Sequence, residues 1–326
     1  MHRPIATAVP TASRVYRLTA GSIFAVMRLQ VWRIRVRGLE HVPRRGGAVI
    51  AANHNSYWDF FTTGGGPYLA WGRPVRILAK EALFEAPVLG PIMRRAGHIP
   101  VRRASGARAL RDAVKALEAG ELVLVLPEQT ISPSFELLSF KPGAARMAAA
   151  AGVPLIPAVS WGSHRFHTVG RRPRLHRRLP VGVRYGAPLR PLPDEDPSQV
   201  TAVLRRRMRQ LLEHEQRSYP DGTPAGAWWV PARLGGGAPT REAAAVDVSR
   251  LEETWRTAAE RLRQARTQVR HETLHARQRL DDARAAVRDE VQEQAQHARE
   301  RLLEGVDHTR VRLGRDLMPD RPAEDR

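Results

Sequence analysis

The sequence predicts an α/β fold in which helices flank a largely parallel sheet. First, short apolar runs with the length of buried strands alternate along residues 36–217 with longer segments that have helical composition. Second, two of these runs end directly in clusters of polar residues, where sheets of this kind place their ligands. Third, the charge is unevenly distributed, which divides the chain into two different parts.

The expected strands are the apolar runs at 48–52, 74–78, 122–126, 154–160 and 180–185. Between them we expect helices at 108–118, 143–151 and 199–217, the first two ending near a glycine as helices commonly do. Polar clusters follow the strands that end at residues 52 and 126. Since parallel strands bring their carboxyl ends to one edge, both clusters are expected at the same site.

The chain has 326 residues and a formal net charge of +20, from 53 Lys+Arg against 33 Asp+Glu. Residues 241–326 contain 18 Arg and 18 Asp+Glu, so the whole excess lies in residues 1–240. Such a charge indicates an anionic partner, which composition alone leaves open as nucleic acid, a phospholipid surface or a phosphorylated small molecule. The absence of cysteine excludes a disulfide scaffold, a thiolate metal site and a cysteine nucleophile.

Residues 1–35 are expected to form an N-terminal basic amphipathic helix. On a helix, Arg14, Arg17, Arg28 and Arg35 lie within about 60° of one another, beside a broad apolar face. This pattern suits a helix in the headgroup region of an anionic bilayer, and equally an ordinary helix packed on the domain. The longest charge-free run has 10 residues, about half of what a membrane-spanning helix needs. A signal peptide is not expected, because no cleavage site follows that run.

The C-terminal part is expected to be separate. Residues 218–245 are rich in Pro and Gly and predict an extended connector. Residues 246–318 predict a long charged helix or coiled coil that begins at a capping box headed by Ser249. Its small and apolar residues recur about every 3.6 residues, which fits either self-association with a partner helix or a lone solvated helix. Residues 319–326 form a tail.

The sharpest local feature is the segment Asn53–Asp59, with the sequence NHNSYWD. His54 and Asp59 can form a dyad in which the carboxylate accepts the Nδ1 proton and leaves Nε2 free as a general base. Residues five apart diverge by about 140° on a regular helix, so the pair needs a turn or a helix start. From the spacing alone, a structural histidine is the more common explanation.

Four segments in order extend this reading: NHNSYWD at 53–59, GHIPVRR at 97–103, LPEQTIS at 126–132 and GVPLIPA at 152–158. Together they resemble the four ordered blocks of the glycerophospholipid acyltransferases, the lysophosphatidic acid acyltransferase family. The segments that begin at Lys80 and Lys141 also look like the connecting segments of this family. The resemblance covers roughly residues 15–235 and implies a single acyltransferase domain at 36–217.

The resemblance also implies roles for individual residues. His54 would deprotonate the hydroxyl of the acceptor, and Asp59 would orient His54. Arg103 would hold the phosphate of the acceptor, since a guanidinium binds phosphate in a bidentate manner. Glu128 would bind the hydroxyls of the acceptor or order the site, and Thr130 matches the same block as a substrate-binding residue.

Two residues of the third block depart from the family pattern. Ile131 stands where the family usually has arginine, which removes one expected phosphate donor. Either Arg102 or Lys141 compensates, or the acceptor is not lysophosphatidic acid. Gln129 stands where the family usually has glycine, and is expected to need an ordinary backbone conformation where glycine could take a positive φ.

The implied activity is transfer of a fatty acyl group from an acyl-CoA or acyl-carrier-protein thioester to a lysophospholipid, forming phosphatidate from 1-acylglycerol-3-phosphate. The enzyme would be peripheral or monotopic, on the cytoplasmic face of the plasma membrane. One alternative is a related O-acyltransferase with another acceptor, such as a glycolipid or another lysolipid. A lesser alternative is a non-enzymatic membrane- or nucleic-acid-binding protein.

No cofactor beyond the thioester co-substrate is expected, and no metal, since no zinc-type ligand spacing occurs. Nucleic acid is not an expected partner, because no recognisable nucleic-acid module is present and only 19 residues are aromatic.

Overall fold

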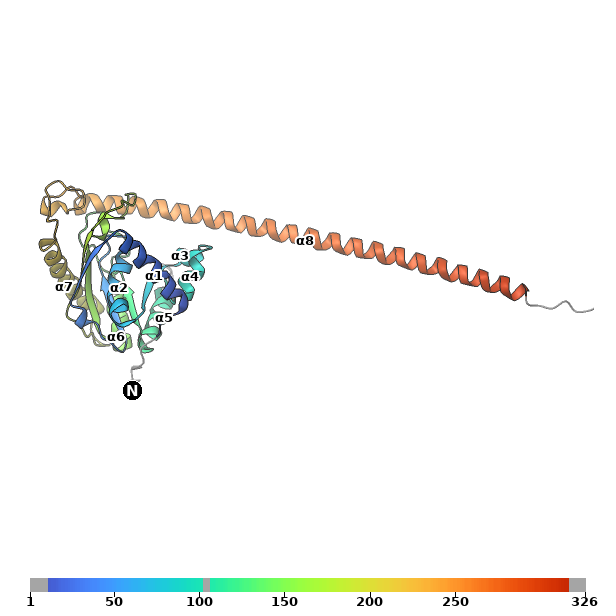
Figure 1. Ribbon diagram of the computed structural model, residues 1–326, viewed down its shortest axis with the longest axis horizontal. Coiled ribbons are helices and arrows are strands. Elements are labelled where there is room, and N and C mark those ends of the chain that lie inside the picture. The colour runs from blue at the N-terminus through green and yellow to red at the C-terminus, as the bar shows by residue number, and fades with distance from the viewer. Residues whose placement is uncertain (1–10, 102–105, 317–326) are drawn as a thin grey trace, which may run out of the picture. The chain divides into compact units, whose positions relative to one another are not determined.

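The computed structural model describes residues 11–101 and 106–316 of the chain. The chain divides into two compact units, Met1–Leu251 and Glu252–Arg326. The first unit contains the sheet with its flanking helices, and the described part of the second unit continues the last helix (Figure 1).

Within the described residues, seven strands form one sheet in the order β1-β7-β6-β2-β5-β3-β4. The strands are β1 (Arg33–Arg37), β2 (Ala48–Ala52), β3 (Val75–Lys80), β4 (Ile99–Val101), β5 (Leu122–Val125), β6 (Leu155–Trp161) and β7 (Pro180–Tyr185). All neighbours pair in parallel except β6 and β7, which are antiparallel. The prediction of an α/β fold with a largely parallel sheet is therefore confirmed.

The central strands are apolar throughout because both of their faces are covered. Every residue of β2 is buried, and Val49 aligns with Val123 of β5 on one side and Leu155 of β6 on the other. Strands buried on both faces read as continuous apolar runs, and this is why their positions could be predicted from the sequence.

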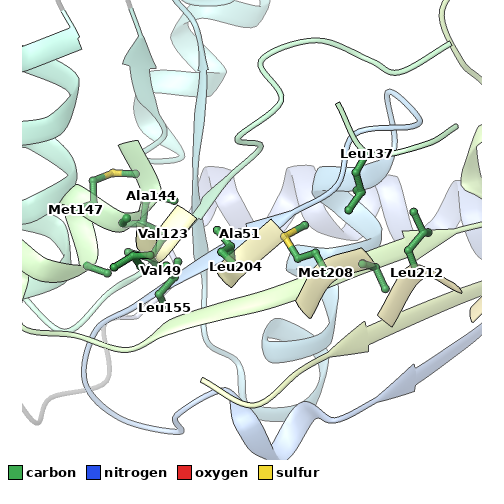
Figure 2. Packing of buried hydrophobic residues seen from close by; sticks show 14 of the residues in the cluster. Val49, Ala51, Val123, Leu137, Ala144, Met147, Leu155, Leu204, Met208 and Leu212 are labelled. Carbon is green, nitrogen blue, oxygen red and sulfur yellow. The ribbon is translucent and has the colours of Figure 1, made fainter. Parts of the chain in front are cut away.

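Helices cover both faces of the sheet. They are α1 (Arg14–Leu29), α2 (Asp59–Trp71), α3 (Glu81–Glu85), α4 (Leu89–Arg95), α5 (Gly106–Glu118), α6 (Gly143–Ala151) and α7 (Pro197–Arg217). Side chains of α5, α6 and α7 pack on one face in a single core, in which Leu204 and Met208 of α7 lie over the β2 and β6 strands (Figure 2). Trp58, Phe60 and Trp71 at α2 cover the other face.

The N-terminal helix is shorter than the predicted segment 1–35. Ser13 caps α1 by accepting a hydrogen bond from the Tyr16 amide, and the helix ends at Leu29. The following Val31 takes a positive φ of 55°, after which residues 33–37 form the edge strand β1. Arginine alternates with Ile34 and Val36 in this strand, because only one of its faces turns toward the core. Residues 1–10 of the predicted helix lie outside the described residues.

The α1 helix packs on the α/β unit. The Phe24 ring stacks on Tyr68 of α2 with centroids 6.2 Å apart, and the Tyr16 hydroxyl accepts a hydrogen bond from the Val75 amide at 3.0 Å. Its outer side exposes arginines together with Leu18 and Leu29. None of the described helices combines the length and the apolarity needed to cross a bilayer.

The segment predicted as an extended connector, 218–245, is instead packed on the core. Tyr219, Trp229 and Val230 are buried in the same cluster as the α7 side chains. Its prolines and glycines shape tight turns, among them the short 3-10 helix Ala232–Leu234, rather than an extended chain. Composition correctly indicated the lack of a strand or long helix in residues 218–240, but it could reveal neither the burial of this segment nor the start of a helix at Arg241.

The last helix, α8 (Arg241–Asp316), has 76 residues and begins earlier than predicted. Thr240 precedes it and accepts a hydrogen bond from the Ala243 amide, so Ser249 lies inside the helix and does not start it. Several apolar side chains of α8 are more than half exposed, including Val269, Leu280 and Val291. Self-association through this helix stays a prediction.

Candidate active site

The polar segment after β2 forms a turn that folds back on itself. The Nδ1 atom of His54 lies 3.3 Å from Oδ2 of Asp59, which is the first residue of α2. The helix start supplies the geometry that a regular helix could not. His54 and Asp59 therefore meet as a pair, as the spacing permitted.

Four donors converge on the buried carboxylate of Asp59. Its Oδ2 atom accepts from the amides of Asn55 at 2.6 Å and Ser56 at 2.7 Å, in addition to His54. Its Oδ1 atom accepts from the Ser163 hydroxyl at 2.9 Å. Position at a helix N-terminus further favours a negative charge. The carboxylate is thus held in one orientation, and it fixes the imidazole in turn.

The segment after β5 holds the backbone of His54 on both sides. The His54 amide donates to Oε1 of Glu128 at 2.8 Å, and the His54 carbonyl accepts from the Ser132 amide at 2.8 Å. The second oxygen of Glu128 accepts from the Leu138 amide, also at 2.8 Å. Both oxygens are therefore engaged with the backbone, which supports the site-ordering role among the two that were expected for this residue.

Glu128 is also electrostatically unusual. Its burial raises the pKa of the carboxyl to about 8, with a further rise from the nearby Asp59 carboxylate. The backbone hydrogen bonds from Leu138 and His54 act in the opposite direction. A buried carboxyl in this position holds its proton at pH values where an exposed one is ionised.

A side-chain amide joins the ends of two central strands. Asn53 accepts from the Ser160 amide at 2.7 Å and donates to the Ser160 carbonyl at 3.1 Å. The Ser160 hydroxyl lies 2.9 Å from the hydroxyl of Thr62 in α2. This bidentate contact fixes the start of the catalytic turn to β6, and sequence reasoning did not identify it.

The turn after β6 supports the dyad from the other side. Gly162 has a φ of 106°, and a Cβ there would collide with the Pro180 carbonyl, so only glycine fits this turn. The next residue, Ser163, thereby reaches Asp59. His164 is fully buried, which lowers its pKa to about 3, and its Nε2 atom lies 3.0 Å from the Trp229 carbonyl. The packed segment 218–245 is thus linked to the site through the turn.

The backbone of Gln129 differs from the expectation. Its φ is 63°, so this residue occupies the left-handed region that was expected to need glycine. The prediction of an ordinary conformation is wrong, because the tight turn that brings Glu128 under His54 imposes the geometry regardless of the side chain. Gln129 adopts this strained backbone conformation although it is not glycine. Its side chain is exposed, so it makes no buried contact.

The remaining predicted site residues are placed as follows. Arg102 and Arg103 lie outside the described residues. Thr130 is half-buried, and Lys141 is exposed while its amide donates to the Pro127 carbonyl at 3.0 Å. Ile131 is buried, with 6% of its surface exposed, so an apolar contact replaces the expected arginine.

An apolar cavity lies one side chain away from the His54–Asp59 pair, which does not itself line the cavity. The Phe60 ring of α2 lies with its centroid 5.8 Å from that of His54, and it also lines a cavity between α1, α2 and β3. Other lining residues are Phe61, Ile23, Phe24 and Tyr68. As for a metal, the part of the chain that the structure describes contains no cluster of three His, Asp or Glu side chains able to hold one.

Comparisons with known proteins point to acyltransferases. Residues 33–161 match the family model described as Acyltransferase. The chain is 31% identical over 143 residues to the chloroplastic 1-acyl-sn-glycerol-3-phosphate acyltransferase of Arabidopsis thaliana, covering 43% of this chain and 39% of that protein. It is 28% identical over 151 residues to the 1-acyl-sn-glycerol-3-phosphate acyltransferase of Bacillus subtilis (strain 168), and this match covers 45% of this chain and 72% of that protein.

A solved structure shares the fold. The crystal structure of the 1-acyl-sn-glycerophosphate acyltransferase PlsC from Thermotoga maritima aligns with a TM-score of 0.52 and 24% identity, covering 63% of this chain and 79% of that one. The match to the Arabidopsis protein spans less than half the length of that relative.

Proposed function

We propose that this chain, whose residues 33–161 match the Acyltransferase family model and which resembles 1-acyl-sn-glycerol-3-phosphate acyltransferases, transfers a fatty acyl group from a thioester to the hydroxyl of a lysophospholipid. The proposed acceptor is 1-acylglycerol-3-phosphate and the product is phosphatidate. The donor would be acyl-CoA or an acyl carrier protein, with no further cofactor. The relatives named above support the acceptor class, and the site supports the chemistry.

The proposed reaction is a direct transfer. Nε2 of His54 takes the proton of the acceptor hydroxyl as the oxygen attacks the thioester carbonyl carbon. The tetrahedral intermediate then collapses, the carbon–sulfur bond breaks, and His54 returns the proton to the departing thiolate. Asp59 keeps Nδ1 protonated and stabilises the imidazolium between these two steps.

The observation that carries this proposal is the contact between His54 and Asp59. Burying a carboxylate without any exposed surface costs free energy, which the four hydrogen bonds to Asp59 offset. Such an arrangement is typical of a site in which the carboxylate orients another group. The apolar cavity lined by Phe60 has a volume of about 40 Å³ in this structure, so it would have to widen to take a fatty acyl chain, and the Phe60 ring lies between it and the imidazole. The dyad fits acyl transfer and is not required by a protein that only binds.

A second candidate function differs from the first in the identity of the acceptor. Ile131 is buried where the family usually presents arginine, so this position supplies no guanidinium to a phosphate. A related acceptor without that phosphate, such as a glycolipid, is the alternative that this residue favours. A panel of acceptors compared by kcat/KM separates the two: a preference for 1-acylglycerol-3-phosphate supports the first, and a preference for an uncharged acceptor supports the second.

The catalytic proposal is tested with purified full-length protein, acyl-CoA and lysophosphatidic acid, by following the release of thiol. We expect His54→Ala to lower the rate by at least 100-fold, which is the usual contribution of a general base. The matched control is His214→Ala, at an exposed histidine of α7. Thermal stability should be similar in both variants, and equal turnover by wild type and His54→Ala would reject the mechanism.

A further inference from the structure

Two segments that are distant in sequence meet beside the active site. The Arg178 amide donates to the Gln30 carbonyl at 3.0 Å, and the Arg33 amide donates to the Leu179 carbonyl at 2.8 Å. The turn between α1 and β1 is therefore joined to the loop that precedes β7. We call residues 28–35 and 171–178 together the arginine surface.

The charge of this surface is neutralised only in part, by Glu215, which lines a small pocket together with Arg33 and Arg35. Its exposed arginines are Arg28, Arg33 and Arg35 from the first segment, and Arg171, Arg172, Arg174, Arg177 and Arg178 from the second. The stretches 14–39 and 137–193 contain no Asp or Glu at all. Among the described residues none of these arginines pairs with a carboxylate, whereas the neighbouring Arg165 and Arg184 pair with Asp221 and Glu215.

Large apolar side chains stand among these arginines. Leu29 is 81% exposed, Leu175 is 84% exposed and Val31 is 44% exposed. Their exposure to water is unfavourable in a free protein. Arginines surrounding protruding aliphatic side chains are typical of surfaces that enter the headgroup region of a bilayer.

The residues that shortly precede the loop 171–178 are joined to the turn that carries His54. The Ser56 hydroxyl donates to the His167 carbonyl and the Thr168 hydroxyl donates to the Asn55 carbonyl, each at 2.7 Å. The ring of Tyr57, itself 43% exposed, lies 4.5 Å from the His167 ring. Whatever binds the loop 171–178 is therefore brought next to the turn that carries His54.

We propose that the arginine surface docks this protein on an anionic phospholipid bilayer and presents the catalytic turn to it. The inference rests on the proposed function in one respect, that the lysophospholipid would reach His54 from the membrane. Charge complementarity alone also fits nucleic acid, but a duplex offers no apolar partner to Leu29 and Leu175. The bilayer satisfies both kinds of side chain.

Vesicle co-sedimentation of the full chain tests the docking without any need for catalysis. We expect tight binding to phosphatidylcholine vesicles that contain phosphatidylglycerol and weak binding to phosphatidylcholine alone. The variant Arg172→Gln/Arg174→Gln/Arg177→Gln should bind the anionic vesicles roughly 100-fold less tightly, at about fivefold for each arginine. The control Arg108→Gln/Arg111→Gln/Lys115→Gln makes the same change of charge at exposed positions of α5 and should bind like wild type.

Leu175→Asn tests the apolar part of the surface. Salt screens the arginines but not the insertion of a leucine, so this variant should lose about tenfold in vesicle binding at high salt. Equal losses in both triple variants, or equal binding of wild type to neutral and anionic vesicles, would overturn the proposal. So would loss of coenzyme A binding or duplex DNA binding in the arginine variant while vesicle binding persists.

A soluble short-chain acceptor separates this proposal from the proposed function. The arginine variant should turn it over like wild type and should be slower only on acceptor embedded in anionic vesicles. If wild type transfers no acyl group to either acceptor, the proposed function fails, and the sedimentation result still decides the docking.

Discussion

Two loops occupy equivalent places in this fold and use their side chains in opposite ways. The loop 53–58 follows β2 and the loop 126–142 follows β5, and these strands are neighbours in the sheet. The first loop presents the His54 side chain. The second directs the Glu128 side chain inward, where both of its oxygens accept amide hydrogen bonds.

The difference teaches that one acidic residue in such a site can contact the side chain of a histidine while another contacts the backbone of the same histidine. Asp59 accepts from the imidazole itself, whereas Glu128 accepts from the amide of the same histidine. Both carboxyl groups are buried, so the identity of the donor is what separates their contacts with His54. Substitutions at the two residues should therefore produce different patterns of damage.

The largest expected effect is that of Asp59→Asn. An amide cannot accept from all four donors, and its own NH₂ group would face donors in the present structure. We expect kcat to fall by about 1000-fold, within the usual range for acid–base catalysis. Circular dichroism checks that the fold persists. Activity within tenfold of wild type would show that Asp59 does not orient the imidazole.

Glu128→Gln should instead change stability in a pH-dependent way. The pKa of Glu128 is about 8 in the folded protein and near 4.5 in the unfolded chain, so the folded state binds the extra proton between these values. Stability due to this group is therefore complete below pH 4.5 and is lost as the pH rises through 8. The glutamine variant lacks this loss, although one amide donor then faces its NH₂ group, at a cost of about 1–3 kcal/mol.

The measurement is the free energy of unfolding in urea at pH 5 and pH 8. The wild type should be more stable than Glu128→Gln at pH 5. The difference between their free energies of unfolding should be smaller at pH 8. His98 and His164, whose pKa values burial lowers to about 4 and about 3, oppose this trend below pH 6.5. They are common to both proteins and cancel in the difference. A gap that does not change with pH would contradict the raised pKa.

The central strands of the sheet could be predicted from the sequence, whereas the strands at its edges could not. The strands at 48–52 and 180–185 and the helix at 143–151 were predicted at their observed bounds, because apolar runs and terminal glycines mark them. Residues 33–35 of the edge strand β1 were assigned to the N-terminal helix, because Arg35 falls on the basic stripe that Arg14, Arg17 and Arg28 would form on such a helix. The short strand β4 left no periodic pattern.

In the site, the dyad could be predicted because its members are five residues apart and a family resemblance points to them. The contacts that support the dyad could not be predicted from the sequence. Ser163 and Ser160 approach the catalytic turn across separations of 104 and 107 residues, which only the pairing of β2 with β6 brings together. Serine is common and its hydroxyl gives no pattern by which its partner could be found.

Ser163→Ala sharpens the comparison at a smaller scale, because it removes one of the four donors to Asp59 and leaves Glu128 untouched. A hydrogen bond to a charged group is worth about 1.5–3 kcal/mol, so we expect kcat to fall by roughly tenfold with little change in KM. Thr201→Val is the control, since it deletes a buried hydroxyl of α7 that donates to the Pro197 carbonyl. Loss of stability in both variants but of kcat in only one would identify Ser163 as a positioning residue, and equal kcat values would exclude that role.

The smallest expected effect concerns the turn that carries Glu128. Gln129 is exposed and has a φ of 63°, so Gln129→Gly removes backbone strain without removing any buried contact. The left-handed region costs a non-glycine residue about 1–2 kcal/mol. Glycine also gains freedom in the unfolded chain, which offsets about 0.4–1 kcal/mol. The variant should be more stable by about 0.5–1 kcal/mol in urea unfolding, while Gln129→Ala, which keeps the strain, should not be. If alanine stabilised the protein as much as glycine, the effect would come from the glutamine side chain, and the strain in the turn would have to be held by contacts other than those of residue 129.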